Sequence, residues 1–357
     1  AITMAGHADE HVYWLTLEHG VRGFTSSTYY RSALPGWVEA VNEELLNTLW
    51  TDTVWTSTVP EAERERARAD FLETEGNGIH PVFPHRALEE VADVDIESIG
   101  DWLERTPYQD EAVFRLANAA LAALELGQRG VVDYLALGLS ATDGIGHRYG
   151  PLSQEQFDNL LRLDRELGAF MQRLDEQLGP DGWVLAVSAD HGVLDMVEWR
   201  QQQGLPGHRL TSAERSQMAE LAREFGDDPD ELATALEALD VIADAMPLNE
   251  LRSAEPAADS FVQLFKASHV DGRFTGPFPG TDVVVRYSEG MYDSSRGTGH
   301  GAPYHYDRWV PFMLIGPGVA AGSRDERAST TDIAPSLAAL AGISVPEDLD
   351  GVNRMAR

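Results

Sequence analysis

Five side chains of metal-ligating type lie in three short segments of the chain, each close to an apolar run. They are Asp143, His147, Asp190, His191 and His300. Taken singly, each could be a helix cap or a hydrogen-bonded turn residue. Together, in a chain without cysteine, they offer the oxygen and nitrogen ligands that zinc accepts at about 2.0 to 2.2 Å. Because two metal ions roughly 4 Å apart can hold both oxygens of a phosphoryl transfer, the sequence predicts a two-metal site for phosphate-ester hydrolysis.

Three apolar runs are expected to position these side chains. They are residues 131–140, 183–188 and 309–315. Each is short, continuous and bounded by polar or glycine residues, which is typical of a buried parallel strand. Ligands of open α/β sheets gather at the carboxyl ends of the strands. The candidate ligands are therefore expected along one edge of a parallel sheet.

Helical patterns alternate with the apolar runs. Residues 153–179 place apolar side chains at helical spacing, and Ser153 and Gln156 form a capping-box pattern at the start. Residues 111–126 and 332–341 are predicted as further helices. Strand, helix and strand make a βαβ crossover. The order predicts an α/β fold, a three-layer α/β/α sandwich with a mostly parallel sheet.

Two segments interrupt this alternation. Residues 60–70 form a charged, arginine-rich helix candidate, and residues 211–251 form a long acidic helical region. Both patterns are more typical of surface insertions than of a core. We therefore predict a single domain over residues 1–357, with insertions or cap elements at residues 60–105 and 204–281.

The composition limits the partners. The formal net charge is −32, and such a chain repels nucleic acid, whose binding depends on basic groups and counterion release. The longest apolar runs fall well short of the roughly 20 residues that span a bilayer. No nucleic-acid partner and no membrane span are expected.

Three sequence phrases around the candidate ligands resemble those of a known family. They are residues 140–151 (SATDGIGHRYGP), residues 189–192 (ADHG) and residues 297–304 (GTGHGAPY), the last followed by Tyr306 and Asp307. Weaker agreement extends to residues 5–7, 13–14, 26–30, 83–85, 106–108 and 332–335. At these positions the chain resembles the alkaline phosphatase superfamily. Within it, the chain is similar to the phosphate-irrepressible alkaline phosphatases related to type I phosphodiesterases and nucleotide pyrophosphatases.

The resemblance implies a fold, two zinc ions and an activity. It implies that Asp143, His147 and His300 bind one zinc ion, and that Asp190 and His191 are two of the ligands of the other. It implies an alkaline-phosphatase-like fold, a small phosphorylated substrate, and hydrolysis of phosphate monoesters through a phosphoryl-enzyme on Thr or Ser. It also implies a periplasmic or secreted location.

Part of the family's site has no counterpart in this chain. The remaining Asp ligand of the second zinc, the Thr or Ser nucleophile, and the Lys and Arg that grip a phosphate oxygen in the monoesterases are all missing, because the chain resembles the family only from beyond these positions. We therefore expect a C-terminal fragment that lacks the N-terminal strands of the sheet and contains no catalytic nucleophile. Because strands of the sheet are missing, we expect exposed strand edges. Because the nucleophile is missing, we expect the chain alone to be inactive.

Alternatives share the same metals. A phosphodiesterase or nucleotide pyrophosphatase would differ in the groups that hold the phosphate oxygens, and a sulfatase agrees less well with the motifs. A catalytically inactive metal-binding fragment is a further alternative, which the literal sequence favours more than the family resemblance does. The remaining histidines, which have no acid at a useful spacing, are interpreted as surface or hydrogen-bonded structural groups; for His305, five residues after His300, a supporting role at the metal site stays open. They are His7, His11, His19, His80, His85, His208, His269 and His305.

Overall fold

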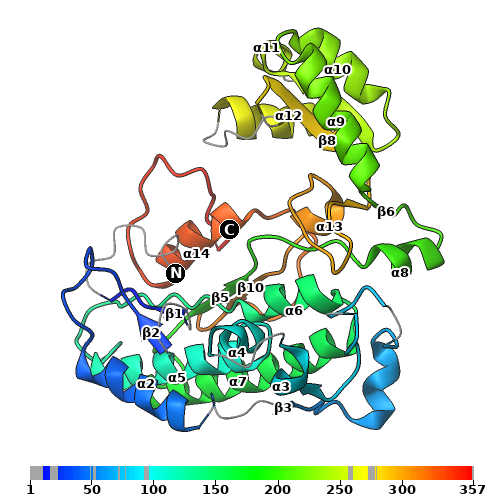
Figure 1. Ribbon diagram of the computed structural model, residues 1–357. Helices are drawn as coiled ribbons and strands as arrows, with labels where there is room; N and C mark the ends of the chain where they lie inside the picture. Colours follow the sequence, from blue (N-terminus) through cyan, green and yellow to red (C-terminus); the bar gives the residue numbers. More distant parts are fainter. Residues whose placement is uncertain are drawn as a thin grey trace. The chain divides into compact units, whose positions relative to one another are not determined.

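The structure is a computed structural model that describes most of the chain. The described residues are 11–16, 23–48, 50, 54–70, 73–76, 78–91, 96–255, 260–271, 278 and 280–355. Two compact units divide the chain (Figure 1). Unit 1 is Ala1–Glu73, Ile79–Asp190 and Val310–Arg357, and unit 2 is Thr74–Gly78 and His191–Trp309. The insertions at residues 60–105 and 204–281 stay a prediction, and parts of both segments, like His7 and His19, lie outside the described residues.

Unit 1 is mainly helical. Its α-helices are α2 (Gly36–Asn47), α3 (Ala87–Glu90), α4 (Ile96–Leu103), α5 (Tyr108–Ala123), α6 (Ala141–Tyr149), α7 (Gln154–Leu178) and α14 (Ile333–Leu340), with short 3-10 helices η2 (Glu61–Arg66) and η4 (Thr330–Asp332). The Ser153 hydroxyl caps α7 by accepting the Gln156 N–H at 3.0 Å. The helices expected at residues 111–126, 153–179 and 332–341 are confirmed as α5, α7 and α14, with small shifts of their ends.

The strands of unit 1 form antiparallel pairs. They are β1 (Trp14–Thr16) with β2 (Gly23–Thr25), β3 (Val54–Trp55) with β4 (His85–Arg86), and β5 (Leu185–Ser188) with β10 (Phe312–Ile315). The parallel pairing expected for residues 183–188 and 309–315 is wrong, because Phe312 lies opposite Ser188 and Ile315 opposite Leu185. The chain thus returns to the end at which it left β5, as in a long hairpin.

The apolar run at residues 131–140 is not a strand. It is extended, and Leu137 and Leu139 pack against α5 and α7 through the buried Phe114 and Phe170. Most of its other side chains face solvent, with Tyr134 77% exposed. Within the described residues no strand pairs with this segment. The buried strand predicted here is therefore wrong: one side of the segment covers helices, and its backbone has no described strand as neighbour.

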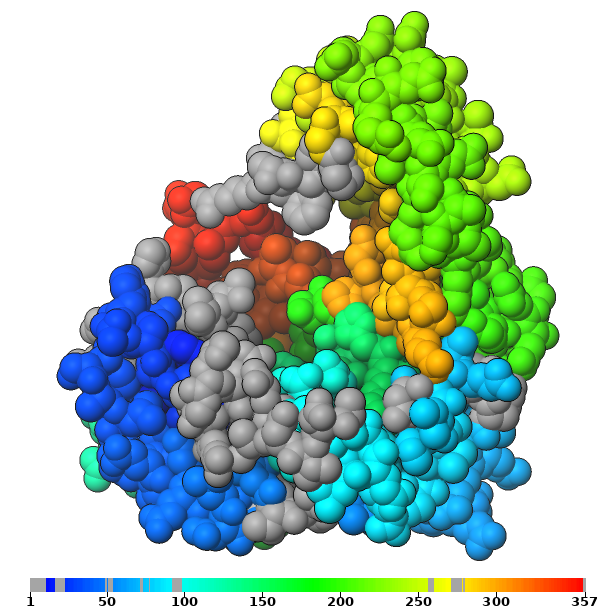
Figure 2. All heavy atoms as spheres, viewed as in Figure 1, coloured from blue at the N-terminus to red at the C-terminus, as the bar shows by residue number. Residues whose placement is uncertain are grey.

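Unit 2 combines short strands with helices. Its elements are α8 (Val197–Gln202), β6 (His208–Arg209), α9 (Ser212–Phe225), α10 (Pro229–Glu237), β7 (Ile242–Pro247), α11 (Leu248–Ser253), α12 (Ser260–Phe265), the π-helix η3 (Lys266–Asp271), β8 (Val283–Tyr287), β9 (Met291–Tyr292) and α13 (His305–Arg308). β7 and β8 pair antiparallel, and β6 and β9 pair parallel. The green surface in Figure 2 contains α9 and α10. The helical prediction for residues 211–251 is wrong at residues 242–247, which form β7.

Among the described residues, no helix is both long enough and apolar enough to cross a membrane. The α/β class is confirmed, since helices and strands share both units. The mostly parallel sheet is not found in the described part of the chain, where four of the five strand pairs are antiparallel.

Candidate metal centre

The helix α6 of unit 1 carries two of the candidate ligands on one face. Asp143 and His147 are one helical turn apart, so their side chains meet, and Asp143 Oδ1 lies 3.3 Å from His147 Nε2. Two atoms at about 2.1 Å from one ion lie about 3.4 Å apart at a tetrahedral angle. Both side chains are partly exposed, at 44% and 39%. The pair therefore fits a shared zinc ion in donor chemistry and in spacing.

The opposite face of α6 is buried. Ala141, Ile145 and Tyr149 recur every four residues and are at most 1% exposed, within a core that also contains Trp55 and residues of α2 and α5. Helical periodicity puts these three side chains roughly opposite the ligand pair. Packing of one face thus fixes the direction in which the other face presents Asp143 and His147.

A buried ionic cluster holds the end of α6. Arg148 donates to Glu90 at 2.8 Å, and His85 lies between two glutamates, 2.9 Å from both Glu90 and Glu155. Burial would lower the pKa of His85, but its hydrogen bonds to Glu155 and Glu90 outweigh this and raise the pKa to about 9. Since Arg148 follows His147, the cluster fixes the backbone beside a candidate ligand.

The sequence interpretation found no acid partner for His85. The structure supplies two, and the structural role assigned to this histidine is consistent with its full burial. Glu90 is close in sequence, but Glu155 is 70 residues away. No spacing rule could have joined His85 to Glu155.

The loops of unit 2 bring two further candidate ligands together. The rings of His191 and His300 are stacked, with centroids 3.4 Å apart and planes 13° from parallel. His191 Nδ1 lies 2.9 Å from the Gly192 carbonyl oxygen, and because a carbonyl oxygen only accepts, Nδ1 is the donor. This is the tautomer in which a histidine coordinates a metal through Nε2.

Main-chain hydrogen bonds tie the His191 loop to the His300 loop. The Gly192 N–H donates to the Asp307 carbonyl at 2.6 Å, and the Leu194 N–H donates to the Gly299 carbonyl at 2.9 Å. The Thr298 hydroxyl, which is fully buried, donates to the Leu194 carbonyl at 2.7 Å. The two loops, about 110 residues apart in the chain, are thus held in register within unit 2.

Asp307 supports the same loops with its side chain. Its Oδ2 accepts the Ala302 N–H at 2.6 Å, and the carboxylate is 4% exposed. Burial raises the pKa of Asp307 to about 6, although backbone hydrogen bonds from Ala302 and Gly301 and the charge of His191 act in the opposite direction. Asp307 belongs to the sequence phrase used for the resemblance, but its position between the loops could not be read from it.

A second network anchors the start of the His300 loop. Arg209 donates to both carboxylate oxygens of Glu198 at 2.6 and 2.9 Å, and to the Gly297 carbonyl at 3.0 Å. Thr74 donates to Glu198 at 2.8 Å and accepts the Gly297 N–H at 2.8 Å. Sequence reasoning missed these residues, because Thr74, Glu198 and Arg209 come from three separate segments.

The structure thus groups the candidate ligands as two pairs, each within its own unit. Asp143 and His147 meet on α6 in unit 1, and His191 and His300 meet on the loops of unit 2. Asp190 is the exposed residue at which the chain passes from unit 1 to unit 2. That all five residues act as one site stays a prediction.

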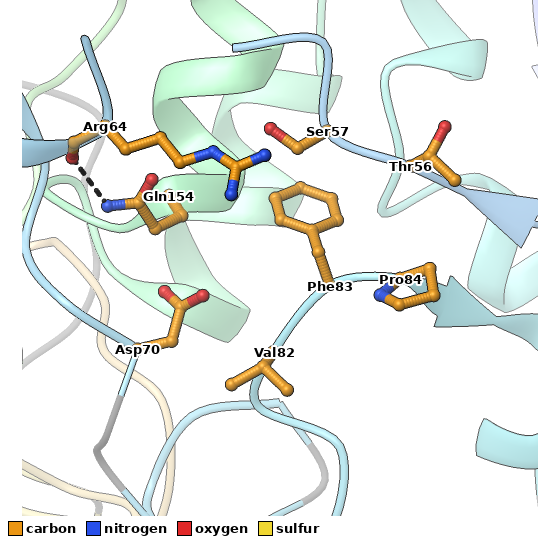
Figure 3. A pocket seen from close by; sticks show the side chains of 8 residues that line it. All are labelled: Thr56, Ser57, Arg64, Asp70, Val82, Phe83, Pro84 and Gln154. Carbon is orange, nitrogen blue, oxygen red and sulfur yellow. Dashed lines mark hydrogen bonds between the residues drawn. The ribbon is translucent and has the colours of Figure 1, made fainter. Parts of the chain in front are cut away.

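A separate cavity of about 500 Å³ lies in unit 1 (Figure 3). The Arg64 guanidinium points toward Ser57 and the Phe83 ring, and the Asp70 carboxylate also points toward the space. The remaining lining residues are Thr56, Val82, Pro84 and Gln154. None of the candidate ligands lines this cavity, so it is distinct from the metal-ligating residues.

Comparison with known proteins defines the class. The chain belongs to the type I phosphodiesterase / nucleotide pyrophosphatase family, whose model matches residues 11–267, and its relatives are phosphoric ester hydrolases. This confirms the family to which the sequence phrases point.

Individual relatives are alkaline phosphatases. The chain is 27% identical to alkaline phosphatase PafA of Elizabethkingia meningoseptica, over 98% of this chain and 68% of that protein. It is 28% identical to alkaline phosphatase PhoV of Synechococcus elongatus, over 97% of this chain and 66% of that protein. The crystal structure of wild-type PafA superposes with a TM-score of 0.82 at 24% identity, covering 96% of this chain and 69% of that one. The alkaline-phosphatase-like fold is therefore confirmed, and the chain spans about two thirds of the length of these relatives.

Proposed function

We propose that this chain supplies most of the metal ligands of a two-zinc phosphomonoesterase. Asp143, His147 and His300 would hold one zinc ion, and Asp190 and His191 would hold the other together with a ligand that this chain does not provide. The observation that carries the proposal is the Asp143–His147 pair on α6, with its 3.3 Å spacing. The stacked histidines of unit 2 and the alkaline phosphatase relatives support it.

The residues of this chain would hold the zinc ions and orient the side chains that bind them. α6 presents one carboxylate and one imidazole from a packed helix, and the Gly192 carbonyl keeps His191 in the tautomer that coordinates through Nε2. Bound zinc would activate a nucleophile and stabilise the leaving oxygen of the ester. No side chain of this chain is proposed as the Thr or Ser nucleophile. A small phosphate monoester is the proposed substrate, and a periplasmic or secreted location follows from the family resemblance.

A phosphodiesterase or nucleotide pyrophosphatase activity is the second candidate. The description of the matching family model favours it. It would use the same metal ligands, and the groups that separate it from a monoesterase are not among the residues assigned here. Turnover of p-nitrophenyl phosphate against that of its bis-ester distinguishes the two activities.

The test of the proposal measures zinc and turnover on the same samples. After zinc loading and desalting, we expect this 357-residue chain to retain zinc and the Asp143→Ala and His147→Ala variants to lose it, as measured by elemental analysis. We expect no turnover of either ester by the chain alone, for lack of a nucleophile. Zinc retention that is unaffected by both substitutions would overturn the ligand assignment. Turnover that is abolished by His300→Ala would overturn the inactivity of the chain.

A further inference from the structure

The helix α6 begins without a capping side chain of its own. Ser140, at the N-cap position, makes no side-chain hydrogen bond there, although the first N–H groups of a helix have no partner within it. A residue of α5 takes this role: Asp110 Oδ1 accepts the Ala141 N–H at 3.0 Å, and the Ser140 N–H interacts with the same carboxylate. Asp110 is 3% exposed. The start of α6 is therefore capped from another helix.

The helix α7 grips the next residue of α6. Asn159 Nδ2 donates to the Thr142 hydroxyl at 3.1 Å, and Gln156 Nε2 donates to the Thr142 carbonyl at 3.1 Å. Both side chains are buried, at 1% and 5% exposed. Hydrogen bonds thus hold Thr142 at both its hydroxyl and its carbonyl oxygen. Because Thr142 directly precedes Asp143, they fix the chain immediately before the first ligand.

The polar contacts and the apolar packing of α6 constrain different motions. The buried face formed by Ala141, Ile145 and Tyr149 limits rotation of the helix about its axis. Hydrogen bonds to Ala141 and Thr142 limit sliding along that axis, because they are directional and lie at one end. A shift of the helix by a fraction of a turn would move Asp143 and His147 together, and both kinds of contact oppose it.

We propose that Asp110, Gln156 and Asn159, together the α6 clamp, are positioning residues for the Asp143–His147 metal-ligand pair. The inference rests on the proposed function, since it assigns the clamp to that pair. Hydrogen-bond partners of metal ligands typically change metal affinity by about 10- to 100-fold when they are removed. The clamp acts one step further out, through the backbone that carries the ligand.

A purely structural role for these residues predicts a different result. Buried polar groups are hydrogen-bonded throughout proteins, and losing a partner lowers stability wherever it lies. Metal affinity measured on the folded chain separates the two roles, because a merely stabilising contact changes the unfolding equilibrium and leaves the binding geometry of the folded chain unchanged.

The experiment titrates the chain with Co²⁺, whose visible absorption reports the coordination geometry. Thr142→Val removes the hydroxyl that Asn159 holds, and Asn159→Ala removes its donor. We expect both to weaken Co²⁺ binding by about 10-fold or more and to alter the absorption bands. Thr142→Ser, which keeps the hydroxyl, should restore binding. The matched control is Asn118→Ala, because Asn118 donates to Phe114 within α5, away from α6, and it should bind Co²⁺ as the wild type does.

Wild-type affinity and an unchanged spectrum in folded Thr142→Val and Asn159→Ala, with binding lost in Asp143→Ala, would overturn the clamp and leave the proposed function standing. If either variant fails to fold, Gln156→Met tests the same clamp at the carbonyl of Thr142, with the same expected and contradicting results.

If the wild type itself binds no Co²⁺ through Asp143, the proposed function fails and the positioning role of the clamp fails with it. Amide hydrogen exchange on the metal-free chain tests separately whether the clamp restrains α6. Asn159→Ala should speed exchange in α6 and leave α2 unchanged. Equal protection of α6 in variant and wild type would overturn the inference.

Discussion

The two candidate ligand pairs are built on opposite principles. Asp143 and His147 share one helix, whose back is packed into the core and whose start is held by side chains of α5 and α7. His191 and His300 lie about 110 residues apart on two loops, and mainly backbone hydrogen bonds hold these loops together. The spacing of Asp143 and His147, called the helix pair below, comes from the local geometry of one helix. The spacing of His191 and His300, called the loop pair below, depends on how two loops distant in sequence are aligned.

This difference determines where each pair is vulnerable. A helix keeps an i, i+4 spacing as long as the helix forms, so the first pair should tolerate changes that leave α6 in place. The loop pair should be sensitive to any atom that separates the two backbones. The following substitutions break or sharpen this comparison, and the largest expected effect comes first.

Gly192→Ala attacks the loop pair at its closest contact. A Cβ at this position would lie 2.0 Å from the Tyr306 carbonyl oxygen, so the loops must separate, and we expect a loss of about 3 kcal/mol or more in the free energy of unfolding. The control is Gly168→Ala in α7, where nothing lies within 4 Å of the added Cβ and helix propensity favours alanine. Urea unfolding measures both. A Gly192→Ala chain as stable as Gly168→Ala would contradict the tight loop contact.

His85→Gln tests the ionic cluster behind the helix pair. The pKa of His85 is raised to about 9, so its stabilising contribution is complete below pH 6.5 and disappears as the pH rises through 9. Between pH 6 and 10 the wild type should lose its advantage in unfolding free energy over His85→Gln by roughly 2 to 3 kcal/mol. Urea unfolding at several pH values measures this difference. A difference that stays constant over the range would show that His85 is not held protonated.

Ser153→Ala and Thr211→Ala each remove a helix cap. The helix that Ser153 caps contacts the residue before Asp143, whereas the helix that Thr211 caps has, within the described part of the chain, no such connection to a candidate ligand. Ser153 caps α7 next to Gln156, and Thr211 caps α9 in unit 2, where a capping box with Glu214 forms. Each substitution should lower the free energy of unfolding by about 1 kcal/mol. Zinc titration should show weaker binding only for Ser153→Ala, because α7 carries Gln156 and Asn159 of the α6 clamp, whereas α9 carries no residue of the clamp. Equal zinc affinities in both variants would remove that distinction.

Asp143 and His147 could be predicted as candidate ligands because their chemistry and their four-residue spacing are local, but the sequence placed them at the carboxyl end of a strand, whereas the structure has them on the helix α6. An acid and a histidine at positions i and i+4 meet once the segment is helical, and the capped helix at residues 153–179 is equally visible in the sequence. The loop pair could be recognised only by its sequence phrases. Nothing local shows that Leu194 bonds to Gly299, or that Asp307 lies between the two loops.

Strand pairing was the part that the sequence could not determine. The apolar runs at residues 183–188 and 309–315 do form strands, but their relative direction depends on where the intervening unit returns the chain. The run at residues 131–140 has the composition of a buried strand and lacks a described partner, so most of its side chains are exposed. Composition records what a segment is suited to bury, and neighbours from elsewhere in the chain decide whether it is buried.

The central claim is that a residue from each pair binds the same zinc ion. A double-mutant cycle with zinc titration tests it most directly, using Asp143→Ala, His300→Ala and the double variant. We predict that each single substitution abolishes the same tight binding event and that the double variant loses no more than either one. Independent losses that add in the double variant, or tight binding that survives either single substitution, would contradict the account.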